Sequence, residues 1–256
     1  MAYTMEYPTR QLFYQWLDQK ELDNVCFNKL GTIPFANSNS ITYQVPLASS
    51  NNPYFGNNKC IGIDIPVLIH PESDKNNGQT LVIVGQSAQR DKHSNWPTNH
   101  ALVGCPFAVS HIMSKPSQCD VYKLIFGKLL NLGYNLYITD AIKMWWTDKR
   151  PIFDSNDKDI FLKEINLISK KNNIKAIITW GKTAEYFVKS LPIGKNHQPN
   201  IIHLMHPGIL NWDRWKLSLF EEAVYNNNPQ LASQYYPNNN TSSSADIVSD
   251  LVVRKI

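Results

Sequence analysis

The chain has 256 residues, of which 43% are hydrophobic, and this size and composition favour a single domain with a substantial core. Its formal net charge of +4 is compatible with a basic nucleic-acid-binding face but does not require one. No apolar run approaches the roughly 18 residues of a membrane-spanning helix, and the N-terminus lacks the apolar segment of a signal peptide, so we expect a cytoplasmic protein.

The cysteines are widely spaced and include no Cys-x-x-Cys pair. Structural zinc sites usually take their ligands from such pairs, so the spacing argues against a zinc site. We expect no metal or other cofactor, and we interpret the cysteines as buried thiols in a reducing compartment. They are Cys26, Cys60, Cys105 and Cys119.

The first 79 residues give only weak structural signals. Over residues 8–22, apolar side chains recur at helical spacing, which predicts an amphipathic helix. Residues 31–79 are rich in Asn, Ser, Pro and Gly, and we interpret them as loops with short strands.

From residue 80 onward, short apolar runs alternate with helical segments. The runs are typical of buried parallel strands and lie at 81–84, 134–139, 175–180 and 201–205. The helical segments lie at 117–132, 157–172, 181–189 and 212–225. This alternation predicts an α/β fold, a three-layer α/β/α sandwich around a short, mainly four-stranded parallel sheet. The polar run at 237–245 predicts a flexible C-terminal tail over residues 236–256.

Parallel sheets of this kind place their sites at the carboxyl ends of the strands. In this sequence, each predicted strand end carries glycine or a polar side chain. The four ends read Gly85-Gln86-Ser87, Asp140, Gly181-Lys182-Thr183 and His206-Pro207-Gly208. We therefore expect these segments to meet at one edge of the sheet.

Taken in order, these segments resemble the motifs of the uracil-DNA glycosylase superfamily. The family's Gly-Gln-Asp-Pro-Tyr loop is matched by residues 85–89, and its base-stacking phenylalanine by Phe107 within NHALVGCPFAVS. Its base-reading asparagine is matched by Asp140, its Trp-Gly strand end by residues 180–181, and its His-Pro-Ser-Pro-Leu segment by residues 206–210. Each motif is weak alone, and their order and placement at strand ends carry the resemblance.

The resemblance covers roughly residues 80–225 and implies a uracil-DNA glycosylase-like fold. The first 79 residues have no clear counterpart, so we interpret them as a divergent N-terminal extension of a single domain over residues 1–235. The implied activity is a DNA glycosylase, which flips a base out of the DNA and hydrolyses its N-glycosidic bond, leaving an abasic site. DNA is then the partner, and we expect a monomer.

The resemblance also implies roles for individual residues. His206 would donate a hydrogen bond to the departing base, where negative charge develops. Leu210 would fill the gap that the flipped base leaves. The residues implied to line the base pocket are Gln86, Ser87, Gln89, Phe107 and Asp140, and those implied to contact DNA are Lys143, Lys182, Gly208 and Leu210.

Three departures from the family pattern point away from uracil. Ser87 stands where the family has a water-positioning aspartate, and Asp91 is the nearest acid that would replace it. Gln89 stands where a tyrosine ring crowds the 5-position of the base, so this gate is more open. Asp140 replaces the asparagine, and a carboxylate accepts hydrogen bonds but donates none.

The Asp140 substitution favours cytosine, because its N4 amine donates where uracil O4 accepts. An enzyme that removed ordinary cytosine would destroy its own genome. We therefore expect a 5-modified cytosine, hydroxymethylated or glucosylated, and a role in defence against bacteriophages. The alternatives are a uracil-DNA glycosylase of base-excision repair and an inactive DNA-binding member of the fold.

More ordinary interpretations exist for the same residues. Asp91, Asp140 and His206 would each suit a capping or locally hydrogen-bonded position, and Leu210 would suit core packing. Trp145 and Trp146 are better explained by core packing than by base stacking. The Gly-Lys-Thr at 181–183 is not a phosphate-binding P-loop, because Ala176 stands where that motif needs its first glycine.

Overall fold

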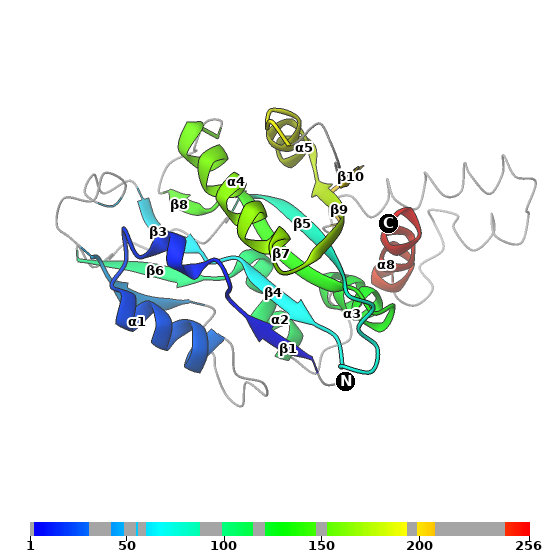
Figure 1. Cartoon of the computed structure of the whole chain (residues 1–256), viewed down its shortest axis with the longest axis horizontal. Coiled ribbons are helices and arrows are strands. Elements are labelled where there is room, and N and C mark those ends of the chain that lie inside the picture. The colour runs from blue at the N-terminus through cyan, green and yellow to red at the C-terminus, as the bar shows by residue number, and fades with distance from the viewer. Residues whose placement is uncertain are drawn as a thin grey trace, which may run out of the picture.

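A six-stranded sheet runs through the centre of the computed structural model (Figure 1), with strand order β1-β4-β7-β5-β9-β10. The structure describes residues 3–30, 42–48, 55, 60–87, 99–114, 121–146, 153–193, 199–207 and 244–256. The strands are β1 (Thr4–Glu6), β4 (Val67–His70), β7 (Asn135–Ile142), β5 (Gln79–Ser87), β9 (Asn173–Trp180) and β10 (Asn200–Leu204).

Four neighbouring strands of this sheet are parallel, as the alternation of apolar runs and helices predicted. β5 pairs in parallel with β7 on one side and with β9 on the other, and β10 continues the parallel sheet beyond β9. β4 joins antiparallel to β7, and β1 joins antiparallel to β4. β1 and β4, which come from the segment interpreted as a divergent N-terminal extension, complete the central sheet of the domain.

Helices cover both faces of the sheet, because its buried strands are apolar on both sides. On one face, Leu81 and Ile83 belong to a core shared with α2 (Val109–Ser114) and α3 (Val121–Asn131). On the other face, Val82 and Val84 pack with α4 (Ser155–Ser169) and α5 (Lys182–Lys189). The chain is thus an α/β protein with three layers.

Local sequence explains where two of these helices begin and end. The side chain of Asp154 accepts hydrogen bonds from two backbone N–H groups at the start of α4, and Asp157 completes a capping box. After α3, Gly133 adopts a left-handed φ of 87°, where a Cβ would collide with the backbone oxygen of Lys75. Glycine therefore allows the sharp turn from α3 into β7.

A second sheet packs beside the first, in the order β2-β6-β3-β8. Its strands are β2 (Tyr43–Pro46), β6 (His100–Gly104), β3 (Cys60–Asp64) and β8 (Met144–Trp146). Gly62 of β3 is required here, because a Cβ would overlap the ring of Trp145. Trp145 is buried in this packing, which confirms its interpretation as a core residue.

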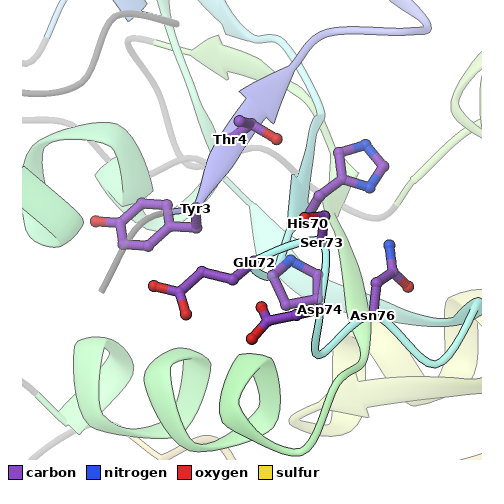
Figure 2. Close-up of a pocket in the computed structure, with 8 residues that line it drawn as sticks. Tyr3, Thr4, His70, Glu72, Ser73, Asp74 and Asn76 are labelled. Atoms are coloured by element: carbon purple, nitrogen blue, oxygen red, sulfur yellow. The ribbon is translucent and has the colours of Figure 1, made fainter.

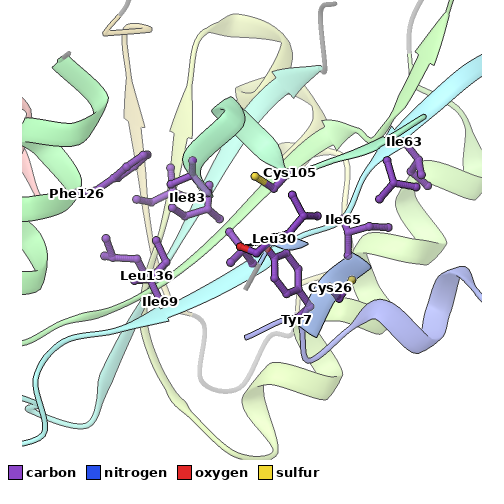
Figure 3. Packing of buried hydrophobic residues seen from close by; sticks show 14 of the residues in the cluster. Tyr7, Cys26, Leu30, Ile63, Ile65, Ile69, Ile83, Cys105, Phe126 and Leu136 are labelled. Atoms are coloured by element: carbon purple, nitrogen blue, oxygen red, sulfur yellow. Dashed lines mark hydrogen bonds between the residues drawn. The ribbon is translucent and has the colours of Figure 1, made fainter. Parts of the chain in front are cut away.

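One continuous core joins the two sheets (Figure 3). In this close-up, Ile63 and Ile65 lie at one side of the cluster and Ile83 and Phe126 toward the other. Cys26, Cys60 and Cys105 are buried thiols, as expected, while Cys119 lies outside the described residues.

The N-terminal helical segment is broken rather than continuous. Residues Arg10–Phe13 form a 3-10 turn, α1 spans Gln19–Asn24, and a π-helical turn follows over Val25–Leu30. Asp18 explains the break, since its side chain accepts a hydrogen bond from the backbone N–H of Glu21 and starts a new helix. The prediction of one helix over residues 8–22 is wrong.

The C-terminal residues form helix α8 (Ser244–Lys255), which packs on α3. Val248 and Val252 are fully buried, and the ammonium of Lys128 donates to Ser249 Oγ at 2.6 Å and to Asp250 Oδ1 at 2.7 Å. The predicted flexible tail is therefore wrong for residues 244–256. The rest of that tail and the helix predicted at 212–225 lie outside the described residues. Within the described part of the chain, every helix is too short or too polar to cross a membrane.

Candidate functional site

An open surface hollow of about 560 Å³ lies at the amino ends of the parallel strands (Figure 2). It is lined by polar side chains, including Glu72 and Asp74. His70 is held there by Glu6 and by Asn135, each at 2.9 Å, and the Glu6 carboxylate raises the pKa of His70. Acidic side chains in this lining would repel the phosphates of DNA. In α/β folds, sites lie at the carboxyl ends of the parallel strands, whereas this hollow lies at their amino ends, so we do not propose it as the DNA site.

At the opposite end of the sheet, Gly85 and Asp140 are paired neighbours on β5 and β7. Asp140 is 3% exposed and lies within β7, which runs to Ile142 rather than ending at 139 as predicted. A Cβ on Gly85 would lie 2.5 Å from Phe107 Cζ and still closer to Asp140 Oδ1. Glycine at this position therefore lets the carboxylate of Asp140 and the ring of Phe107 approach each other.

Phe107 reaches this place from the turn between β6 and α2. Both Phe107 and Ala108 have left-handed backbones, with φ values of 56° and 49°, which cost energy for residues with a Cβ. The ring centroid of Phe107 lies 5.1 Å from that of Trp180 and 5.2 Å from that of Tyr122. Strained backbone of this kind is often retained at functional sites, because the surrounding packing holds it.

His206 completes the group from the segment just after β10. The backbone N–H of Gly181 donates to Leu204 O at 2.9 Å, which ties the ends of β9 and β10 together. The imidazole centroid lies 6.3 Å from that of Phe107, and the Tyr122 hydroxyl is 3.4 Å from His206 Nδ1. Burial lowers the pKa of His206, which favours the neutral imidazole at pH 7.

The sequence interpretation missed Tyr122. It lies in the first turn of α3, and its ring centroid is 5.9 Å from that of His206 and 5.7 Å from that of Trp180. The signal that was available is the spacing of Tyr122 and Phe126, which are four residues apart and share a helix face. The strand ends alone could not show that this face covers the site.

Lys143, predicted to contact DNA, is instead buried. Its ammonium donates to Asp140 O at 2.8 Å and lies 3.2 Å from Glu164 Oε1, with side chains 3% and 0% exposed. The hydroxyl of Thr139 donates to the other Glu164 oxygen at 3.1 Å. Burial raises the pKa of Glu164, and the Lys143 ammonium opposes that rise. Lys143 is therefore an internal ion-pair partner and not a phosphate contact, and the prediction for it is corrected.

Of the other predicted site residues, the structure describes Gln86, Ser87 and Lys182. Gln86 follows Gly85 in β5 and is exposed. Because side chains alternate along a strand, Gln86 points to the face of the sheet opposite the one on which Gly85 meets Phe107. Ser87 ends β5, paired with Ile142, and Lys182 is exposed at the start of α5. Outside the described residues lie Asp91, Gln89, Gly208 and Leu210.

The site therefore combines a buried carboxylate, a strained phenylalanine and a neutral histidine at the carboxyl end of a parallel sheet. Comparison of the chain with protein-family models and with curated proteins gives no match. The argument for function rests on this arrangement.

Proposed function

We propose that the protein is a DNA glycosylase with a uracil-DNA glycosylase-like fold, which releases a 5-modified cytosine and leaves an abasic site. The observation that carries the proposal is the grouping of Asp140, Phe107 and His206. Asp140 and His206 come from the carboxyl ends of parallel strands and Phe107 from the turn after β6, and packing through Gly85, Tyr122 and Trp180 connects them.

The three side chains suit three of the tasks of base excision: stacking on the base, reading its edge and stabilising it as it leaves. An aromatic ring such as Phe107 stacks on a flipped base of any sequence. A buried carboxylate such as Asp140 accepts from an amino group on the edge of the base. A neutral histidine donates through one N–H, and such a donor stabilises the negative charge that develops on the departing base.

The carboxylate at Asp140 is the reason to favour cytosine over uracil. Uracil would place O4 against a second acceptor, and two buried acceptors without a hydrogen between them are unfavourable. Cytosine presents its N4 amine at the same edge. Restriction to 5-modified cytosine follows from the need to spare ordinary cytosine. Because sugar-modified cytosines are chiefly a feature of bacteriophage DNA, the proposal includes a function in defence against bacteriophages.

The proposed partner is DNA, bound by a monomer, and the modest basic charge of the chain is compatible with DNA binding. Lys182 is exposed next to the strand end that leads into α5, so it remains our candidate for a phosphate contact. Lys143 is withdrawn from that role because it is paired inside the protein.

The test is a set of matched duplexes that differ at one base: uracil, cytosine, 5-hydroxymethylcytosine and its glucosylated form. Abasic sites are converted to strand breaks by alkali and counted over time. We expect release from one or both modified cytosines and none from cytosine. Release from uracil alone would support the repair alternative. Tight binding with no release from any duplex would instead support a DNA-binding member without activity.

A further inference from the structure

The hydroxyl of Tyr122 lies beside the imidazole of His206, although the two residues are 84 positions apart in the sequence. It is 3.4 Å from Nδ1 and 3.5 Å from Nε2, and the two rings meet edge to face, at an interplanar angle of 75°. The ring of Tyr122 also packs on Phe107, so one side chain contacts two of the residues to which we assign roles.

A neutral imidazole needs a partner that decides which nitrogen carries the hydrogen. One of its nitrogens donates and the other accepts, and the hydrogen bond made by one nitrogen fixes the role of the other. Tyr122 sits within reach of either nitrogen and has an O–H to donate. We propose that Tyr122 is a positioning residue whose hydroxyl donates to one nitrogen of His206, so that the other presents its N–H to the departing base.

The surroundings of His206 favour this arrangement. Phe107 packs on it from the turn after β6, Trp180 from the end of β9, and Tyr122 from α3. Of these three neighbours, Tyr122 is the titratable one, and among the described residues the acid Asp140 of β7 lies on the far side of Gly85, against Phe107. Burial lowers the pKa of His206, and a hydroxyl that donates to the neutral ring acts in the same direction.

The Tyr122→Phe variant isolates the hydroxyl, since it keeps the ring that packs on Phe107, Phe126 and Trp180. The matched control is Tyr134→Phe. The Tyr134 hydroxyl accepts from Lys175 at 2.7 Å, and the residue lies just before β7, at the other end of the sheet.

The first measurement needs no DNA. The full chain is labelled with ¹⁵N-histidine, and the His206 ring is titrated by NMR. We expect Tyr122→Phe to raise the titration midpoint of His206 by about half a unit to one unit and to shift its tautomer signals, because one neutral hydrogen bond is lost. Tyr134→Phe should leave both unchanged. An unchanged midpoint and tautomer in Tyr122→Phe would overturn the proposal.

The second measurement rests on the proposed function. On the best duplex, Tyr122→Phe should lower kcat about tenfold at pH 7 with little change in KM, and the acidic limb of the rate profile should move upward in pH with the NMR midpoint. A loss of rate with an unmoved acidic limb would assign Tyr122 to packing and overturn the proposal. If no duplex is cleaved, the glycosylase assignment fails while the NMR titration still decides the Tyr122–His206 contact.

Discussion

Replacing Lys143 with methionine removes a positive charge from a place that solvent does not reach. In the intact protein, the Lys143 ammonium lies 3.2 Å from Glu164 Oε1 and also donates to the backbone oxygen of Asp140. In the variant, the Glu164 carboxylate keeps the hydroxyls of Thr139 and Tyr137 as neutral hydrogen-bond partners but loses its counter-ion. A buried carboxylate in this position is expected to take up a proton.

The free energy needed to protonate Glu164 determines how much stability the Lys143→Met variant loses. Protonating a carboxyl group whose ordinary pKa is near 4.3 costs about 3.7 kcal/mol at pH 7, at about 1.4 kcal/mol per pH unit. Because burial already raises the pKa of Glu164 in the intact protein, this value is an upper limit, and we expect Lys143→Met to lower the free energy of unfolding by up to about 3.7 kcal/mol at pH 7. Removing one partner from a buried ion pair usually costs about 3–5 kcal/mol.

The loss should shrink as the pH falls. Glu164 in the variant holds a proton in the folded state that the unfolded chain releases above about pH 4.3, so folding takes up a proton and is favoured by acid. The difference in the free energy of unfolding between Lys143→Met and the wild type should decrease by up to about 1.4 kcal/mol per pH unit between pH 7 and pH 5. Urea unfolding of both proteins at pH 5, 6 and 7 measures this difference.

Lys163→Met on α4, the helix that carries Glu164, is the control for this experiment. The Lys163 ammonium pairs with Asp159 at 2.7 Å, but the two side chains are 56% and 62% exposed, so we expect a change below about 0.5 kcal/mol at every pH. The double variant Lys143→Met with Glu164→Gln should recover much of the lost stability. A Lys143→Met loss no larger than that of the control, or one independent of pH, would refute the reasoning.

Three further substitutions test the geometry of the site. Ala108→Gly should raise the free energy of unfolding by about 0.5–1 kcal/mol, because glycine adopts a left-handed backbone without strain; a destabilised variant in thermal unfolding would contradict this. Gly85→Ala should cost about 1–3 kcal/mol and abolish base release, because its Cβ overlaps Asp140 and Phe107; wild-type unfolding and activity would show that the space is not needed. His206→Ala should slow base release by about 10²–10³-fold, far more than its lost packing on Phe107 and Tyr122 would explain, and a wild-type rate would remove His206 from the mechanism.

The parallel half of the sheet could be predicted because its signals are local. The apolar runs that became β5, β7, β9 and β10 are each followed by a glycine or polar residue, and the runs in the central strands β5 and β7 are buried on both faces. β1 and β4 are only three and four residues long, and they become strands by pairing with each other and with β7. A pairing of residues 4–6 with residues 68–70 is tertiary information that no sequence window contains. Helix α8 was missed because the polar run before it suggested disorder, although Val248 and Val252 have the i, i+4 spacing of a buried helix face.

The candidate site likewise contains residues that the sequence could predict and residues that only tertiary packing brings together. Asp140 and His206 were predicted because strand ends in a parallel sheet must meet at one edge. Tyr122 and Glu164 were not, since they lie on helices, and the sequence does not state which helix face covers which end of the sheet. Lys143 was misjudged for the same reason: its burial depends on α4, which brings Glu164 to it.

Asp140→Asn tests the substrate assignment most directly. An amide can donate to uracil O4 and accept from its N3 hydrogen, while a carboxylate can only accept. We therefore expect the ratio of uracil release to modified-cytosine release to rise by at least about tenfold, the low end of what one matched hydrogen-bond pair contributes. Asp140→Glu is the control, because it keeps the carboxylate but displaces it, and it should lower all activity without favouring uracil. If Asp140→Asn leaves the ratio unchanged, Asp140 does not read the base, and the argument for cytosine fails even if the protein proves to be a glycosylase.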